Sequence, residues 1–202
     1  ILLCLLVTLL ALPAAAQGLL IPVEPDIPPL ALTAHSVDVK IDTQGARTTV
    51  EQVFSNHTNR QLEGQYVFPV PAGATVSRFT MLVNGRETPG ELLEKAEARR
   101  IYNSIVRRAK DPGLLEYIGK DLFRANVFPI AAQGKQRITV RFDQVLSAQD
   151  SLVAYTYPVR TRGKRGPTVH GEITITGEIT SPSPILNVYS PSHSLNVTRP
   201  SE

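Results

Sequence analysis

Short segments in which apolar and polar residues alternate recur along most of this chain, and this spacing constrains its fold more than any other feature. Residues 37–41 (VDVKI) alternate in this way, and residues 48–54 (TTVEQVF) do so again after a turn at Gln44 and Gly45. Successive side chains of a β-strand point to opposite faces, so alternation is typical of a strand with one buried face. The first two segments therefore predict a β-hairpin.

The same alternation returns in later segments that are bounded by glycine, proline or polar residues. Asn84 and Gly85 form the strongest tight-turn signal in the chain. Ile138, Val140 and Phe142 mark the inward face of a central strand. Further strands are expected at residues 62–70, 76–83, 122–130, 135–146, 151–159 and 168–180. The short apolar pieces at 185–189 and 195–197 are expected to form either short strands or docked extended segments. About nine or ten strands predict a mainly β fold, an antiparallel β-sandwich-like domain.

One segment, residues 91–110, follows the rules of a helix instead. Glu91 and Glu94 lie near its start and Arg107 and Lys110 near its end, which matches the helix macrodipole. Its apolar residues fall on one arc at the helical period of 3.6 residues. The sequence therefore predicts one amphipathic α-helix packed on the β-domain.

The amino-terminal residues predict export. Residues 1–16 resemble a secretory signal peptide whose charged start is missing, with small residues before Gln17. An uncleaved membrane anchor is the alternative. Residues 17–34 are rich in proline and are expected to form an extended leader, with order beginning near His35. We therefore expect a secreted or cell-envelope protein, and bacterial export fits slightly better than an animal matrix.

Cysteine usage excludes several kinds of site. The only cysteine, Cys4, lies in the expected signal peptide. The exported chain would therefore contain no disulfide, no cysteine nucleophile and no cysteine-rich zinc site. Its stability must come from its core, because no covalent cross-link is available.

The chain has a formal net charge of +3, which raises the question of an anionic partner. A candidate anion-binding loop contains Arg160, Arg162, Lys164 and Arg165. A solvated loop tip is the preferred explanation for these residues. The anionic partners that they would suit are a glycan or a membrane surface. Nucleic acid is not expected as a partner, because no aromatic residues are interleaved with the basic ones and the chain is expected to be exported.

The sequence offers no catalytic residues and predicts no metal and no cofactor. Its four histidines are scattered without any paired ligand spacing, and exposed loop or strand positions are expected for them. Covalent catalysis has no candidate, because no nucleophile elbow, phosphate loop or dinucleotide fingerprint occurs. Glu94, Lys95 and Glu116 could be presented as an acid–base group, but ordinary helix ion pairs and a partly buried, paired carboxylate explain them better.

Two sequons occur, at Asn56-His57-Thr58 and at Asn196-Val197-Thr198. Both are expected in loops or chain ends. In a eukaryotic secretory pathway they could carry glycans, whereas in a bacterium they have no meaning.

The order of several motifs resembles the VIT domain, the module of inter-alpha-trypsin inhibitor heavy chains. The motifs are QxFxN from Gln52, LEGxYxFPxP at residues 62–71, an NGR turn, ExxEKxEA at residues 91–98, and LLE at residues 114–116. The family-signature residues, all expected to be structural, are Gln52, Phe54, Asn56, Glu63, Gly64, Tyr66, Phe68, Pro69, Pro71, Gly85, Glu94, Lys95, Ala98, Tyr102, Leu115, Glu116 and Phe123.

This resemblance implies a domain organisation and a class of function. Residues 35–148 would form the VIT domain, and residues 149–202 would supply further strands and a linker to a von Willebrand type A domain that is absent from this chain. The resemblance implies a non-catalytic extracytoplasmic module for protein–protein interaction or adhesion, with an unknown protein partner. A basic surface that binds an anionic glycan or lipid is the alternative. The DxSxS metal loop of a type A domain does not occur here.

Overall fold

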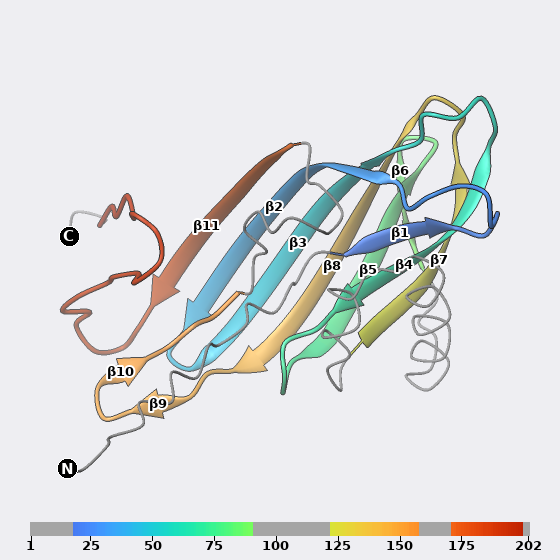
Figure 1. Ribbon diagram of the computed structural model, residues 1–202. Helices are drawn as coiled ribbons and strands as arrows, with labels where there is room; N and C mark the ends of the chain where they lie inside the picture. Colours follow the sequence, from blue (N-terminus) through green and yellow to red (C-terminus); the bar gives the residue numbers. More distant parts are fainter. Residues whose placement is uncertain (1–17, 91–121, 158–170, 200–202) are drawn as a thin grey trace, which may run out of the picture.

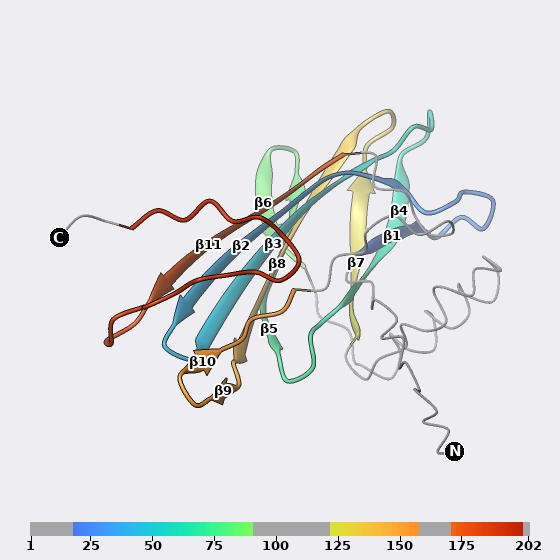
Figure 2. The same ribbon diagram turned by 60° about the vertical axis from the view of Figure 1, so that its left-hand side comes forward.

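The computed structural model describes residues 18–90, 122–157 and 171–199, and within these ranges it contains eleven strands. Most of them form two sheets that face each other (Figures 1 and 2). The prediction of a mainly β, layered fold is confirmed. The helix predicted over residues 91–110 lies outside the described residues.

The larger sheet has six strands in the order β11-β2-β3-β8-β5-β6. Their bounds are Glu172–Thr180 for β11, Ala31–Asp42 for β2, Gly45–Ser55 for β3, Lys135–Val145 for β8, Thr75–Val83 for β5 and Arg86–Pro89 for β6. The predicted hairpin is confirmed as β2 and β3. Asn84 and Gly85 join β5 to β6 with φ angles of 50° and 78°, the left-handed values that a tight hairpin turn requires.

One pairing in this sheet corrects the expectation of an antiparallel fold. β11 runs parallel to β2 over its whole length, from Glu172 opposite Ala34 to Thr180 opposite Asp42. Every other strand pair in the described residues is antiparallel. The alternation of residues 168–180 indicates a strand, but that pattern is the same in either direction. Strand direction was therefore not encoded in it.

The smaller sheet has the order β1-β4-β7, with β1 at Leu19–Pro22, β4 at Leu62–Pro69 and β7 at Leu122–Ile130. The expectation that order begins near His35 is wrong, because β1 pairs with β4 and all four of its residues are buried. Its run of apolar residues has no alternation, because both faces of the strand are covered. Such a strand cannot be separated from an extended leader by periodicity.

An aromatic cluster fills the space between the sheets. Tyr66 on β4 is fully buried, and its ring lies 5.8 to 6.4 Å, centroid to centroid, from four phenylalanine rings. Ile138, Val140 and Phe142 of β8 are also fully buried, as their alternation predicted. Aromatic pairs in this distance range add to the stability that burial alone supplies.

The segment after β8 departs from prediction. A strand was expected over residues 151–159, but the described part contains only the two-residue strands β9 (Ala148–Gln149) and β10 (Leu152–Val153), which pair with each other. Residues 154–157 are not a strand, and Tyr155 and Tyr157 pack against the core of the domain. Their hydroxyl groups hydrogen-bond to Thr48 on β3 and His35 on β2. We call residues 154–157 the tyrosine strap.

Residues 181–199 follow β11 without forming a strand, so short strands, one of the two alternatives expected at 185–189 and 195–197, are not formed. Side-chain hydrogen bonds shape this segment instead. Ser190 Oγ accepts the backbone N–H groups of Ser192 and His193, and Arg199 donates to the carbonyl oxygens of Ile185 and Leu186. Such local bonds offer the backbone an alternative to a ladder. In Figure 1 the segment lies on the side of β11 that faces away from β2, and in Figure 2 it crosses in front of the strands of the large sheet.

Candidate functional site

A chain of hydrogen bonds joins four polar side chains in the interior. His35 on β2 and Gln52 on β3 lie opposite each other in the large sheet, and Gln52 Nε2 is 3.1 Å from His35 Nδ1. The Tyr66 hydroxyl donates to Gln52 Oε1 at 2.6 Å. His35 Nε2 is 2.9 Å from the hydroxyl oxygen of Tyr157 in the tyrosine strap. We call these four residues the polar chain.

The donors and acceptors of the polar chain allow one consistent arrangement. Because Tyr66 donates to Gln52 Oε1, the amide group of Gln52 must face His35, where it can only donate. His35 Nδ1 therefore accepts and carries no proton. The proton of the neutral ring then lies on Nε2, which donates to Tyr157. Each hydrogen bond thus fixes the donor and acceptor of the next one. A second proton on His35 would lie on Nδ1, where it would face the amide N–H donor of Gln52.

Glycine at position 18 makes room for this arrangement. A Cβ atom there would overlap Gln52 Oε1 and would lie 2.6 Å from the Tyr66 hydroxyl oxygen. These positions are closer than nonbonded carbon and oxygen atoms can approach without strain. Any side chain at position 18 would have to displace the hydrogen bond between Tyr66 and Gln52. The hydrogen bond between Tyr66 and Gln52 therefore requires glycine at position 18.

Burial determines the charge states in this region. Desolvation lowers the pKa of His35 from 6.5 to about 4. It raises the pKa of Tyr66 well above its ordinary value of 10.0, and the nearby Tyr157 raises it further. Burial also raises the pKa of Tyr155, against a smaller opposing effect of its hydrogen bond with Thr48. All of these groups are neutral near pH 7, so the polar chain holds no charge.

The polar chain is suited to structure and not to chemistry on a bound molecule. His35, Gln52 and Tyr66 are each at most 1% exposed, so a substrate could not reach their polar atoms. A general acid or base works best with a pKa near the working pH, and neither His35 nor Tyr66 meets that condition. What the polar chain does is satisfy buried polar groups and join the strap to both sheets.

We predict that acid destabilises the domain through His35. Its folded-state pKa of about 4 is below its unfolded value of 6.5, so the unfolded state binds the proton first. Stability is complete above pH 6.5 and falls as the pH drops toward about 4, by roughly 3 kcal/mol in total. Urea unfolding at a series of pH values measures this loss. His35→Gln should remove this dependence, whereas replacement of the exposed His193 by glutamine should leave it unchanged.

Asn56 holds two loops together and explains the end of the QxFxN motif. Its Nδ2 atom donates one hydrogen to the carbonyl oxygen of Arg60 and one to that of Ala131, both at 2.9 Å. Its Oδ1 atom accepts from the backbone N–H and the hydroxyl group of Thr58. The side chain is 1% exposed. A glycan on Nδ2 would displace one of these bonds, so it is incompatible with this arrangement of the two loops.

Most of the other signature residues that the structure describes also serve the fold. Phe54, Phe68 and Phe123 are buried in the aromatic core. A Cβ atom on Gly64 would lie 3.1 Å from side-chain carbons of Leu20 and Ile130, so glycine allows close packing of the small sheet at this point. Among the remaining described signature residues, Pro69 is buried, Pro71 is half-buried and Gly85 forms its turn. Nothing in the structure explains Glu63, whose side chain is exposed.

Several predicted residues lie outside the described ranges. From the signature these are Glu94, Lys95, Ala98, Tyr102, Leu115 and Glu116. From the candidate anion-binding loop they are Arg160, Arg162, Lys164 and Arg165. Their predicted roles remain predictions.

One expectation about the histidines is wrong. His35 was expected at an exposed loop or strand position, but it is 1% exposed on the inner face of the large sheet. The alternation of residues 35–41 contained this information, since His35 has the same parity as Val37 and Val39. Within the described residues no group of three or more histidine, cysteine or acidic side chains could hold a metal ion.

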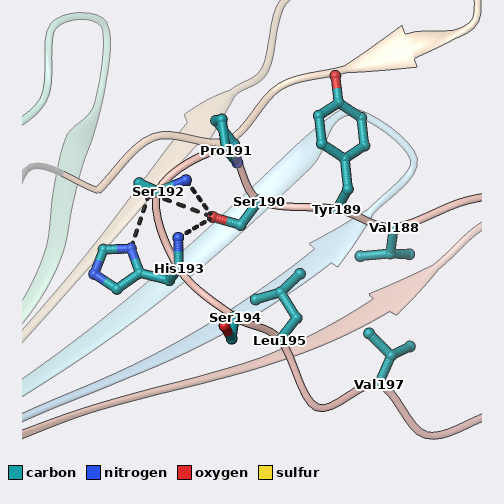
Figure 3. Close-up of a pocket in the computed structure, with 9 residues that line it drawn as sticks. All are labelled: Val188, Tyr189, Ser190, Pro191, Ser192, His193, Ser194, Leu195 and Val197. Carbon is teal, nitrogen blue, oxygen red and sulfur yellow. Dashed lines mark hydrogen bonds between the residues drawn. The ribbon is translucent and has the colours of Figure 1, made fainter.

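A second candidate is an open depression lined by residues of the carboxyl-terminal segment (Figure 3). At its edge the Ser192 hydroxyl lies 2.8 Å from His193 Nδ1, and the Ser190 and Ser192 hydroxyl oxygens lie 3.3 Å apart. These groups are exposed, and the same serines form the local turn that shapes the segment. A Ser–His contact without a positioned acid or oxyanion donors does not activate a nucleophile. We assign this cluster to the turn.

The two facing sheets and the buried signature residues define the chain as a β-domain built around a structural polar core. The family model for the vault protein inter-alpha-trypsin domain (VIT) matches residues 32–142. The chain therefore belongs to the VIT family, and the resemblance seen in its motifs is confirmed. No helix within the described residues is long and apolar enough to cross a membrane.

Three relatives illustrate the range of proteins that contain a similar segment. The protein mono-ADP-ribosyltransferase PARP4 of Mus musculus is 26% identical over 130 residues, which is 64% of this chain and 7% of that protein. Inter-alpha-trypsin inhibitor heavy chain H4 of Homo sapiens is 27% identical over 62% of this chain and 14% of that protein. The von Willebrand factor A domain-containing protein 5A of Homo sapiens is 28% identical over 64% of this chain and 17% of that protein. This chain thus spans less than a fifth of each.

Proposed function

We propose that this chain is a non-catalytic protein-association module that works outside the cytoplasm, within a larger protein that also contains a von Willebrand type A domain. The observation that carries the proposal is the distribution of exposed apolar side chains. Eight of the eleven exposed large hydrophobic residues in the described ranges follow residue 150. These eight are Leu152, Val153, Ile175, Ile179, Leu186, Tyr189, Leu195 and Val197.

This distribution supports a contact with protein. The two sheets and the tyrosine strap already enclose the hydrophobic core. The eight exposed apolar residues after residue 150 are therefore not needed to complete it. Leu186 is 91% exposed and Tyr189 is 63% exposed. Exposed apolar groups that gather on one part of a surface favour protein–protein contacts, and tyrosine is enriched in such interfaces.

Two further observations support the context of the proposal. The apolar run that ends in small residues before Gln17 is typical of a signal for export. One relative is named for a von Willebrand factor A domain, and this chain matches a small share of it. A type A domain elsewhere in the full-length protein would supply the metal-binding DxSxS loop that this chain lacks.

Site-specific photo-crosslinking in the full-length protein tests the association role. A photoreactive phenylalanine analogue at Tyr189 should form a discrete protein adduct, either with a separate partner or with another domain of the same protein. The matched control places the same probe at Arg47, which lies among ion pairs on the outer face of the large sheet. Equal labelling at both positions, or adducts at neither, would contradict the proposal.

The basic loop supports a second candidate, the binding of an anionic glycan or an anionic lipid surface. Replacement of Arg160, Arg162, Lys164 and Arg165 by serine should then abolish salt-dependent retention on heparin. The control replaces four exposed basic residues of the large sheet and its hairpin, namely Arg78, Arg86, Lys135 and Arg137, and removes the same charge. Equal retention of both variants would show that only net charge matters.

A further inference from the structure

We propose that β11 pairs with β11 of a second copy of this chain, in antiparallel register, so that the large sheets of two molecules form one continuous sheet. This inference goes beyond the proposed function, because it concerns two copies of the same chain and requires no other protein. It rests on the backbone geometry of β11 and on the order of its side chains.

β11 is an edge strand whose only charged residues are Glu172 and Glu178. It lies at the end of the six-stranded sheet (Figure 1), with β2 as its only strand neighbour in the described residues. It has nine residues, contains no proline or lysine, and pairs with β2 without a register shift. The opposite edge, β6, has only four residues and ends in Pro89. Proteins normally protect an exposed edge with charges, prolines or bulges. The short β6 with its proline is therefore less suited to pair with a further strand than the longer, regular β11.

The hydrogen bonds to β2 show which backbone groups of β11 point outward. The backbone N–H of Thr43 donates to the carbonyl oxygen of Thr180 at 3.0 Å, so the backbone groups of Thr180 face β2. The N–H and C=O of one strand residue point to the same side, and the side changes at each residue. The backbone groups at the open edge are therefore those of Ile173, Ile175, Gly177 and Ile179.

An antiparallel pair centred on Thr176 uses all four of these residues. Ile173 would lie opposite Ile179 of the second copy, and Ile175 opposite Gly177. Two of these isoleucines are exposed in the single chain, Ile175 at 47% and Ile179 at 42%. Apolar pairs across strands stabilise a sheet, and here they would also continue its apolar face.

The charged residues of β11 fit the same register. Glu172 would lie opposite Thr180 of the second copy and Glu178 opposite Thr174, so no like charges meet. Glu178 already forms an ion pair with Lys40 on β2 at 3.5 Å. A register centred on Ile175 would instead place Glu172 opposite Glu178, which is unfavourable. The strand is therefore self-complementary in the register centred on Thr176.

The segment at residues 181–199 runs on the open side of β11, but it does not occupy the edge as a strand. Among the described residues no backbone hydrogen bond joins this segment to β11. Its local turns and the bonds from Arg199 hold it in its own conformation. It therefore has to shift aside as a unit when the second copy pairs.

Sedimentation velocity on the full chain measures the association. Substitutions at Thr176 test it most directly, because the proposed register is centred on this residue. Thr176 would face its own copy across the two-fold axis, so Thr176→Lys should weaken the dimer by ~10-fold through like-charge repulsion. Thr176→Glu should weaken it similarly, and an equimolar mixture of the two variants should restore it. The control Thr49→Lys lies in the same cross-strand row on β3, where no second copy would approach. It should leave the dimer unchanged.

A cysteine cross-link tests the register separately. In a Cys4→Ser background, Thr176→Cys should form a disulfide-linked dimer under mild oxidation, because directly opposed strand residues lie within disulfide distance. Thr49→Cys should form no disulfide-linked dimer, because no second copy approaches β3. A chain that stays monomeric at the highest attainable concentration overturns the proposal. A dimer whose dissociation constant is changed by neither Thr176→Lys nor Thr176→Glu also overturns it. Slow amide exchange at residues 173–179 in such a monomer would identify residues 181–199 as the occupant of the edge.

Discussion

Replacement of Tyr66 by alanine is expected to lower the free energy of unfolding by ~4 kcal/mol, a large fraction of the stability of a typical domain. The ring is completely buried and contacts four phenylalanine rings, so its removal leaves a cavity. It also leaves Gln52 Oε1 without its donor. Equilibrium unfolding in urea measures the change.

Two controls separate the contributions of the ring and the hydroxyl group. Tyr66→Phe keeps the ring and removes only the hydrogen bond to Gln52, so it should cost about 1 to 2 kcal/mol. Tyr189→Ala removes an exposed ring and should change stability by less than about 0.5 kcal/mol. If Tyr66→Phe were as harmful as Tyr66→Ala, the polar chain and not the aromatic packing would dominate the stability of the core.

Replacement of Asn56 by aspartate is expected to cost at least about 3 kcal/mol, although the two side chains have nearly the same shape. Asn56 Nδ2 donates to two backbone carbonyl oxygens, and an aspartate oxygen in its place would face both of them as a buried negative charge. Thermal unfolding at neutral pH measures the loss. The variant should regain part of its stability on mild acidification, because a protonated carboxyl group can donate one hydrogen bond.

Asn126→Asp is the matched control for this substitution. Asn126 is an exposed residue of β7, so the same chemical change occurs there in contact with water. Its effect should stay within about 0.5 kcal/mol. A comparable loss of stability in both variants would show that the added charge, and not the buried hydrogen bonds of Asn56, is responsible.

Local patterns predicted the strands whose two faces differ in environment. β3 and β8 alternate between buried and exposed residues along most of their length, and their hydrophobic period placed them correctly. The turn at Asn84 and Gly85 was also predicted, because its left-handed backbone needs residues of that type. The pattern failed for β1, which is buried on both faces, and for the direction of β11, which alternation does not encode.

The polar chain shows why a site can be hidden in a sequence. Gln52 and Tyr66 were recognised only as members of family motifs, and His35 was expected to be exposed. The partners of His35 in the structure are residues 17 and 122 positions away along the chain. Hydrogen bonds between such distant residues leave no local pattern. The one available signal was parity, since His35 shares the inward face with Val37 and Val39.

The central claim is that the polar residues at the centre of the family signature support the fold and perform no chemistry. Nitrogen NMR of the His35 side chain tests it most directly, because the chemical shifts report which ring nitrogen holds a proton. The hydrogen bonds predict a neutral ring with its proton on Nε2, unchanged between pH 7 and pH 5. A ring that becomes doubly protonated in that interval, or that holds its proton on Nδ1, would contradict the arrangement of the polar chain and the structural role assigned to it.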